Sequence, residues 1–311
     1  MIVHIGYHKT ATSWLQQHVF GNPRTGLQTV GKFGDDHPVR QLVRARPFEF
    51  DAAICRAQFE PLLRPMQAAG LVPVVSHERL CGHPVSGGHD SKEIANRLKE
   101  VFPDARILVV IREQRSIIIS TYKHYVMAGG ASSLAEFLDP PVSVNMRLPS
   151  FDLRHFEYDH LLRYYRVLFG PEAVLALAFE QFVRDPASFV SAIGRFAGRP
   201  FDDGVVCDLP FDSVRRPSKS ALALAVRRRR NRIRRSELNP SPPFKSPLLK
   251  ELVHVVERVA NKPFVPERLI ARADEALRRG VEEVVGDRYR ESNRATAELT
   301  GIDLGGYGWT V

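Results

Sequence analysis

Short apolar runs separated by helical patterns organise the chain. The runs are residues 1–6, 27–31, 71–76, 106–111 and 173–179. The segments between them carry apolar residues at helical spacing, whereas the runs themselves are typical of buried strands. Strands that alternate with helices predict βαβ units and a mainly parallel sheet. The pattern therefore predicts an α/β fold with three layers, α/β/α, around a mainly parallel central sheet.

The pattern changes in the last third of the chain. Residues from about 212 to 245 are irregular and basic, and residues from about 246 to 300 return to a helical pattern. The sequence contains no internal repeat. We therefore predict a single domain over residues 1–311 that includes both parts.

Composition is that of an ordinary globular protein. The chain has 311 residues, of which 44% are hydrophobic and 25% charged. No apolar stretch reaches the length of a membrane span, and no secretory signal precedes the first strand. The cysteines, Cys55, Cys81 and Cys207, are odd in number and scattered, which suits neither a disulfide framework nor a metal site. We expect a cytoplasmic protein.

The positive charge is concentrated. The net charge is +9, and a dense basic run extends from Arg227 to Arg235. Such a run is most often a solvated face. The functional alternative is docking on an anionic membrane or an acidic glycan, which would place the protein peripherally at the inner membrane face.

The first strand leads into a loop with candidate chemistry. Residues 7–14 read YHKTATSW and precede an amphipathic run. A strand, a tight turn with a lysine and hydroxyls, and a helix start are suited to hold a phosphate, because helix N-terminal N–H groups and the dipole favour an anion. A Walker A loop would need a second glycine where Ala11 stands. A capped helix with a solvated Lys9 is the alternative on this segment alone.

Two later segments add anion-binding side chains at strand ends. Arg112 follows the strand 106–111, and Ser120 lies about two helical turns further on. A guanidinium grips phosphate oxygens bidentately, and a hydroxyl adds a neutral donor. The third segment, 174–182, is a strand followed by a polar turn with Asp185-Pro186.

Together the three segments resemble the sulfotransferases that use 3′-phosphoadenosine-5′-phosphosulfate (PAPS). Their 5′-phosphosulfate loop is similar to Tyr-Pro-Lys-Ser-Gly-Thr-Thr-Trp, from which this chain departs at His8 and Ala11. Arg112 and Ser120 fall at the spacing of the family's 3′-phosphate segment. The resemblance covers roughly residues 1 to 197, and it implies a P-loop-like fold and transfer of a sulfuryl group to a hydroxyl or amine. It also implies PAPS as donor and 3′-phosphoadenosine-5′-phosphate (PAP) as product.

The resemblance also assigns roles to single residues. It implies that Trp14 and Phe179 flank the adenine, and that Tyr122 and His124 face the acceptor. A basic segment closes the donor site in the family, and Arg215 and Arg216 are the best match here, although the family's glycine is missing. The implied donor-binding residues are His8, Lys9, Thr10, Ala11, Thr12, Ser13, Trp14, Arg112, Ser120, Phe179, Arg215 and Arg216.

The strand 71–76 raises the question of the catalytic base. It is followed by His77 and Glu78. Cytosolic relatives use a histidine near this strand end, and carbohydrate-acting relatives a glutamate. The pattern Ser-x-Glu-x-Leu favours Glu78 slightly, but His77 stays open. Lys9 would stabilise charge on the leaving oxygen, so no metal is required. We expect a carbohydrate, glycolipid or small-metabolite acceptor and no nucleic acid.

Two other functions compete with this interpretation. A P-loop kinase acting on a small molecule would need magnesium and a Walker-type glycine. A non-catalytic basic binding module would work through the arginine run, and its binding would weaken steeply with salt.

Overall fold

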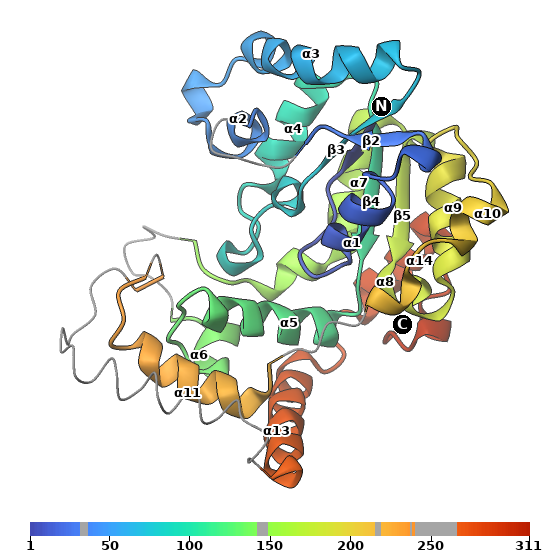
Figure 1. Ribbon diagram of the computed structural model, residues 1–311. Helices are drawn as coiled ribbons and strands as arrows, with labels where there is room; N and C mark the ends of the chain where they lie inside the picture. The colour runs from blue at the N-terminus through green and yellow to red at the C-terminus, as the bar shows by residue number, and fades with distance from the viewer. Residues whose placement is uncertain (32–36, 142–148, 215–218, 237, 240–265) are drawn as a thin grey trace. The chain divides into compact units, whose positions relative to one another are not determined.

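The computed structural model describes residues 1–31, 37–141, 149–214, 219–236, 238–239 and 266–311 (Figure 1). Two sets of predicted residues fall partly or wholly outside these ranges. Arg215 and Arg216 lie outside the described residues, and so do residues 246–265 of the predicted helical C-terminal part.

A five-stranded sheet forms in the order β2-β3-β1-β4-β5. All its pairings are parallel, with Val3 opposite Val75 on one side and Ile107 on the other. The strands are β1 (Ile2–His4), β2 (Leu27–Thr29), β3 (Val72–Ser76), β4 (Arg106–Ile111) and β5 (Val174–Ala178). Each falls within a predicted apolar run, so the predicted α/β fold with a parallel sheet is confirmed.

Helices follow the strands. They are α1 (Thr12–His18), α2 (Val39–Arg44), α3 (Ala52–Ala68), α4 (Ser91–Val101), α5 (Gln114–Met127), α6 (Leu134–Leu138), α7 (Tyr158–Phe169), α8 (Phe179–Arg184), α9 (Pro186–Phe196), α10 (Asp203–Cys207), α11 (Ala221–Asn231), α13 (Glu267–Val285) and α14 (Arg290–Thr300). Helix α11 lies inside the segment predicted to be irregular, because Ser220 caps an alanine- and leucine-rich turn there.

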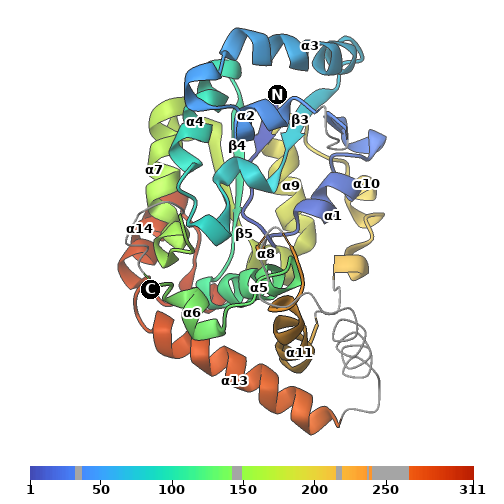
Figure 2. The same cartoon turned by 90° about the vertical axis from the view of Figure 1, so that its left-hand side faces the viewer.

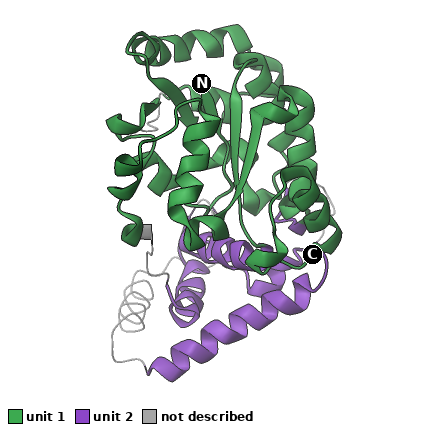
Figure 3. Ribbon diagram, turned by 90° about the vertical axis from the view of Figure 1, so that its right-hand side faces the viewer, with its two compact units in different colours: residues 1–113, 154–215, 289–311 green, residues 114–153, 216–288 purple. Residues whose placement is uncertain are grey.

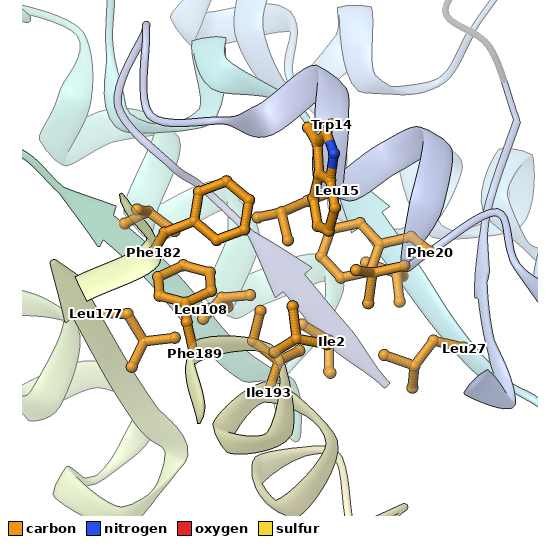
Figure 4. Packing of buried hydrophobic residues seen from close by; sticks show 14 of the residues in the cluster. Ile2, Trp14, Leu15, Phe20, Leu27, Leu108, Leu177, Phe182, Phe189 and Ile193 are labelled. Atoms are coloured by element: carbon orange, nitrogen blue, oxygen red, sulfur yellow. The ribbon is translucent and has the colours of Figure 1, made fainter. Parts of the chain in front are cut away.

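Two helical layers enclose the sheet. Successive strand residues point to opposite faces, so Ile2 and Val3 are buried on different sides. Figure 2 shows α4 and α7 on one side and α1 and α9 on the other. The face under α1, α8 and α9 is filled by large apolar side chains (Figure 4), among them Leu15, Leu108, Phe182, Phe189 and Ile193.

The chain divides into two compact units (Figure 3). Unit 1 is formed by residues 1–113, 154–215 and 289–311 and contains the sheet. Unit 2 is formed by residues 114–153 and 216–288 and contains α5, α6, α11 and α13. A single functional domain over the whole chain stays a prediction.

Unit 1 depends on its apolar face for stability. Phe189 is fully buried in α9, whereas Phe48 is fully exposed. We expect Phe189→Ala to lower the free energy of unfolding by about 3–5 kcal/mol, through lost burial and the cavity left behind. The matched control Phe48→Ala should change it by less than about 0.5 kcal/mol. Denaturant titrations of both variants measure the difference, and equal effects would contradict this account of the core.

Candidate active site

The loop between β1 and α1 has an unusual backbone. Lys9 (φ 68°) and Ala11 (φ 63°) are left-handed, and they are the non-glycine residues with positive φ in the described part of the chain. An L-residue adopts this conformation at a cost of about 1 kcal/mol or more. Such backbone turns successive N–H groups toward one side, which forms a concavity that binds anions. The alanine in place of the family's glycine therefore preserves the turn at the expense of strain.

Side chains within unit 1 hold this backbone in place. The Thr10 hydroxyl donates to the Tyr7 carbonyl (2.5 Å) and is fully buried. The buried Tyr7 hydroxyl donates to the His155 carbonyl (3.2 Å). Arg112 Nη1 donates to the Lys9 carbonyl (2.9 Å) from the end of the neighbouring strand β4. Thr10 thus shapes the loop, and its hydroxyl is already bonded.

A buried histidine lies beneath the loop. His4 Nδ1 lies 2.8 Å from Ser76 Oγ, and Gln16 Nε2 donates to the Ser76 carbonyl (2.8 Å). Burial lowers the pKa of His4 to about 3, so the ring is neutral. A Cβ on Gly6 would lie 2.6 Å from His4 Nε2, which explains why a glycine begins the loop.

The residues at the start of α1 differ in accessibility. The Thr12 hydroxyl is buried and has no hydrogen-bond partner within the described chain, whereas Lys9 and Ser13 are exposed. A buried hydroxyl without a partner costs free energy unless a ligand satisfies it. Trp14 is buried between Phe182 and Phe211, and its Nε1 donates to Ser213 Oγ (3.1 Å). Trp14 therefore belongs largely to the core.

The end of β4 presents Arg112 beside the loop. Its guanidinium lies over the Phe179 ring, 4.6 Å from the centroid, and the Tyr158 hydroxyl donates to the Arg112 carbonyl (2.6 Å). Burial lowers the pKa of Arg112. Phe179 is half-buried. Besides its contact with Arg112, it packs against the core cluster. Sequence analysis missed Tyr158, because nothing local to it indicates a contact with β4.

Glu180 supports the same strand end. Its Oε1 accepts from the Glu113 backbone N–H (3.0 Å), and its Oε2 accepts from Trp309 Nε1 (3.2 Å). Burial raises the pKa of Glu180. Glu180, which belongs to the segment 174–182 that resembles the family, therefore links the ends of β4 and β5 to Trp309.

His77 and Glu78 follow β3 and differ in role. The Arg79 backbone N–H donates to His77 Nδ1 (3.0 Å), so His77 caps the short helix η3 (Glu78–Cys81). Because Nδ1 is an acceptor, the neutral ring carries its proton on Nε2. Burial, with Arg79 and His37 nearby, lowers the pKa of His77 to about 4. Glu78 is instead 40% exposed and lies near the loop, with Oε1 3.9 Å from His8 Nδ1.

The comparisons with known proteins agree with this geometry. Residues 91–203 match the model of a sulfotransferase family. Over this stretch the chain is therefore similar to sulfotransferases. A crystal structure of a sulfotransferase from Alicyclobacillus acidocaldarius shares its fold, with a TM-score of 0.55 and 15% identity over 99% of this chain and 98% of that chain. None of the curated proteins matches.

Three further predicted site residues lie in unit 2. Ser120, Tyr122 and His124 are on α5. Tyr122 is 6% exposed, its hydroxyl donates to the Ser132 carbonyl (3.2 Å), and its ring packs on Phe137. Tyr122 is thus part of the core of unit 2, while Ser120 and His124 are half-buried.

The arginine run from Arg227 to Arg235 is partly internal to unit 2. Arg227 Nη2 donates to the Met127 carbonyl (3.1 Å), and Asn231 Nδ2 donates to the Val126 carbonyl (2.7 Å) at the C-terminal end of α5. Cations at a helix C-terminus are favourable. The exposed members are Arg229, Arg232, Arg234 and Arg235. Contact of these with an anionic membrane stays a prediction.

The described ranges contain no group of three or more His, Cys, Asp or Glu side chains placed to hold a metal. Nor do they contain a helix whose length and apolar character would let it cross a membrane.

The partly buried His77 cap predicts a pH effect on stability. An unfolded His77 takes up a proton below about pH 6.5, whereas the folded one does so only near pH 4. Stability is therefore lost as the pH falls through this window. We expect His77→Asn, which keeps a capping acceptor, to flatten the stability–pH curve there by at most about 1.4 kcal/mol per pH unit. Denaturant titrations across the window measure both slopes, and parallel curves would contradict the role of His77.

Proposed function

We propose that this protein is a sulfotransferase, which moves a sulfuryl group from PAPS to a hydroxyl or amine of a small-molecule or glycan acceptor. The observation that carries the proposal is the loop after β1. Its left-handed Lys9 and Ala11, the buried Thr12 hydroxyl without a partner, and the exposed Lys9 side chain together suit an anionic group.

The donor would be held by residues on two neighbouring strand ends of unit 1. Backbone N–H groups of the loop and the Thr12 hydroxyl would bind the 5′-phosphosulfate, with Ser13 at its exposed side. Arg112 lies beside this loop, where its guanidinium can bind the 3′-phosphate. Ligands of parallel α/β sheets bind at the carboxyl ends of the strands, where these residues lie. By resemblance, Ser120 would complete the 3′-phosphate contacts.

The chemistry would be an in-line displacement at sulfur. Glu78 takes the proton from the acceptor, whose oxygen or nitrogen forms the new bond to sulfur. The bond from sulfur to the oxygen of the 5′-phosphate breaks, and Lys9 stabilises the negative charge that develops on that oxygen. The products are the sulfated acceptor and PAP. Positioning and fixed electrostatics would supply most of the rate gain.

Glu78 is the better base of the two candidates. The Nδ1 lone pair of His77 accepts the Arg79 N–H, and its Nε2 carries the proton, so the neutral ring has no free site for another. A pKa of about 4 also makes His77 a weak base near neutral pH. Glu78 is exposed enough to reach an acceptor, and it lies near the loop that carries Lys9.

A nucleotide titration separates the sulfotransferase from a kinase. We expect isothermal calorimetry to show binding of PAP that is at least about ten-fold tighter than that of ATP, because Arg112 gives the 3′-phosphate a charge-assisted partner worth about 1.5–3 kcal/mol. Binding of PAP should not depend on magnesium. Equal affinity for the two nucleotides, or tighter ATP binding with magnesium, would favour the kinase.

The loop lysine gives a second test. We expect Lys9→Ala to lower transfer of labelled sulfate from PAPS by about 100-fold or more, since a donor aimed at developing charge is worth that much. The circular dichroism spectrum should be unchanged, because the Lys9 side chain is exposed. Lys92→Ala, which removes an exposed lysine of α4, is the control. Transfer at the wild-type rate by Lys9→Ala would refute the mechanism.

A further inference from the structure

Residues 304–310 lie against α8 in unit 1 (Figure 1). Trp309 in this segment is only 4% exposed, and its backbone N–H donates to the Leu304 carbonyl (3.1 Å). The buried Asn293 of α14 donates through Nδ2 to the Thr310 carbonyl (2.8 Å). The backbone on both sides of the Trp309 indole is therefore held in place.

The Trp309 side chain contacts two residues that bond the backbone at Arg112. Its Nε1 donates to Glu180 Oε2 (3.2 Å), while Glu180 Oε1 accepts the backbone N–H of Glu113 (3.0 Å). The centroid of its ring lies 5.8 Å from that of the fully buried Tyr158, whose hydroxyl donates to the Arg112 carbonyl (2.6 Å). The Arg112 carbonyl and the Glu113 N–H belong to one peptide group, so the two partners of Trp309 hold the same peptide plane from opposite edges.

The orientation of this peptide sets the direction of the Arg112 side chain. The preceding peptide is fixed by the sheet, because Ile111 of β4 pairs with Ala178 of β5. A residue has only two soft backbone dihedrals, so fixing the peptides on both sides of Arg112 also fixes its Cα–Cβ bond. Phe179, the residue before Glu180, then supports the guanidinium, which lies 4.6 Å from the ring centroid.

We propose that Trp309 is a positioning residue for recognition of the 3′-phosphate. Through Glu180 and Tyr158 it holds the peptide after Arg112, so that the guanidinium points toward the phosphate. The assignment rests on the proposed function, in which Arg112 binds the 3′-phosphate of the donor. Trp309 acts through its partners and does not touch the nucleotide. Its loss should therefore weaken the contribution of the 3′-phosphate and leave the rest of nucleotide binding intact.

The test compares PAP with adenosine 5′-monophosphate (AMP), which lacks only the 3′-phosphate. Trp309→Phe keeps an aromatic ring and removes the indole N–H that bonds Glu180. A charge-assisted hydrogen bond contributes about tenfold to a hundredfold in affinity, and a misdirected guanidinium loses part of it. We expect the preference for PAP over AMP, measured by isothermal calorimetry, to fall about 3–10-fold, while the affinity for AMP stays within about twofold of the wild type.

A second variant acts on the other edge of the same peptide. Tyr158→Phe keeps the buried ring and removes the hydroxyl that donates to the Arg112 carbonyl. We expect the preference for PAP to fall in the same range. Both nucleotides are titrated on one preparation, so partial unfolding of a variant lowers the binding stoichiometry and does not change the ratio of the two affinities.

Two controls make the test specific. Tyr307→Phe also removes a polar group from an aromatic residue of the segment 304–310, and it keeps the ring that lies beside Arg184. Its preference for PAP should match the wild type. In an Arg112→Ala background, Trp309→Phe should change the preference by less than about twofold, because the guanidinium that it orients is absent.

The outcomes are distinguishable. Equal weakening of PAP and AMP by Trp309→Phe, or an undiminished preference in both Trp309→Phe and Tyr158→Phe, would show a merely structural role and overturn the assignment. So would a similar fall in preference caused by Trp309→Phe with and without Arg112. A wild-type protein that binds PAP no more tightly than AMP would overturn the 3′-phosphate site of the proposed function, and this assignment with it.

Discussion

The strained turn between β1 and α1 is the constraint on which the rest of the site depends. Lys9 and Ala11 are left-handed without being glycine, so surrounding contacts have to compensate for the cost. Those contacts come from separate parts of the chain. Thr10 closes the turn on Tyr7, and Arg112 holds the Lys9 carbonyl from the adjacent strand. The strain is stored at the place where an anion would be bound.

This arrangement gives Arg112 two tasks. One amino group of its guanidinium bonds the loop backbone, and the ring of Phe179 supports the plane of the group. A guanidinium has five N–H donors, which is enough for one group to bond a backbone carbonyl and a phosphate together. In the proposed function, Arg112 would thus bind one end of the donor and also rigidify the turn that would bind the other end.

Much of the fold was predictable from the sequence because most residues of its strands are buried. Parallel strands covered on both faces appear as continuous apolar runs, and each predicted run contains an observed strand. The loop was also predictable, since Lys9 and the hydroxyls follow the first run directly. The sheet order was not, because pairing between distant strands leaves no local signal.

The roles of single side chains were harder to predict. Thr10, Trp14 and His77 all fit a binding motif, yet they close a turn, fill the core and cap a helix, respectively. Their partners are set by tertiary packing or by local backbone geometry, which the motif does not encode. Arg227 was likewise part of a charge run in the sequence but bonds the end of α5 within unit 2.

The bond between Trp309 and Glu180 has a consequence for biosynthesis. Unit 1 is assembled from three separate stretches, the last of which begins at residue 289. Glu180 fixes the backbone after β4 while it accepts the indole N–H of Trp309, and the Trp309 ring also contacts Tyr158. During translation, the sheet can therefore form long before Trp309 is available to bond Glu180 next to Arg112. A nascent chain released before residue 309 would contain Lys9 but would lack the hydrogen bond between Trp309 and Glu180.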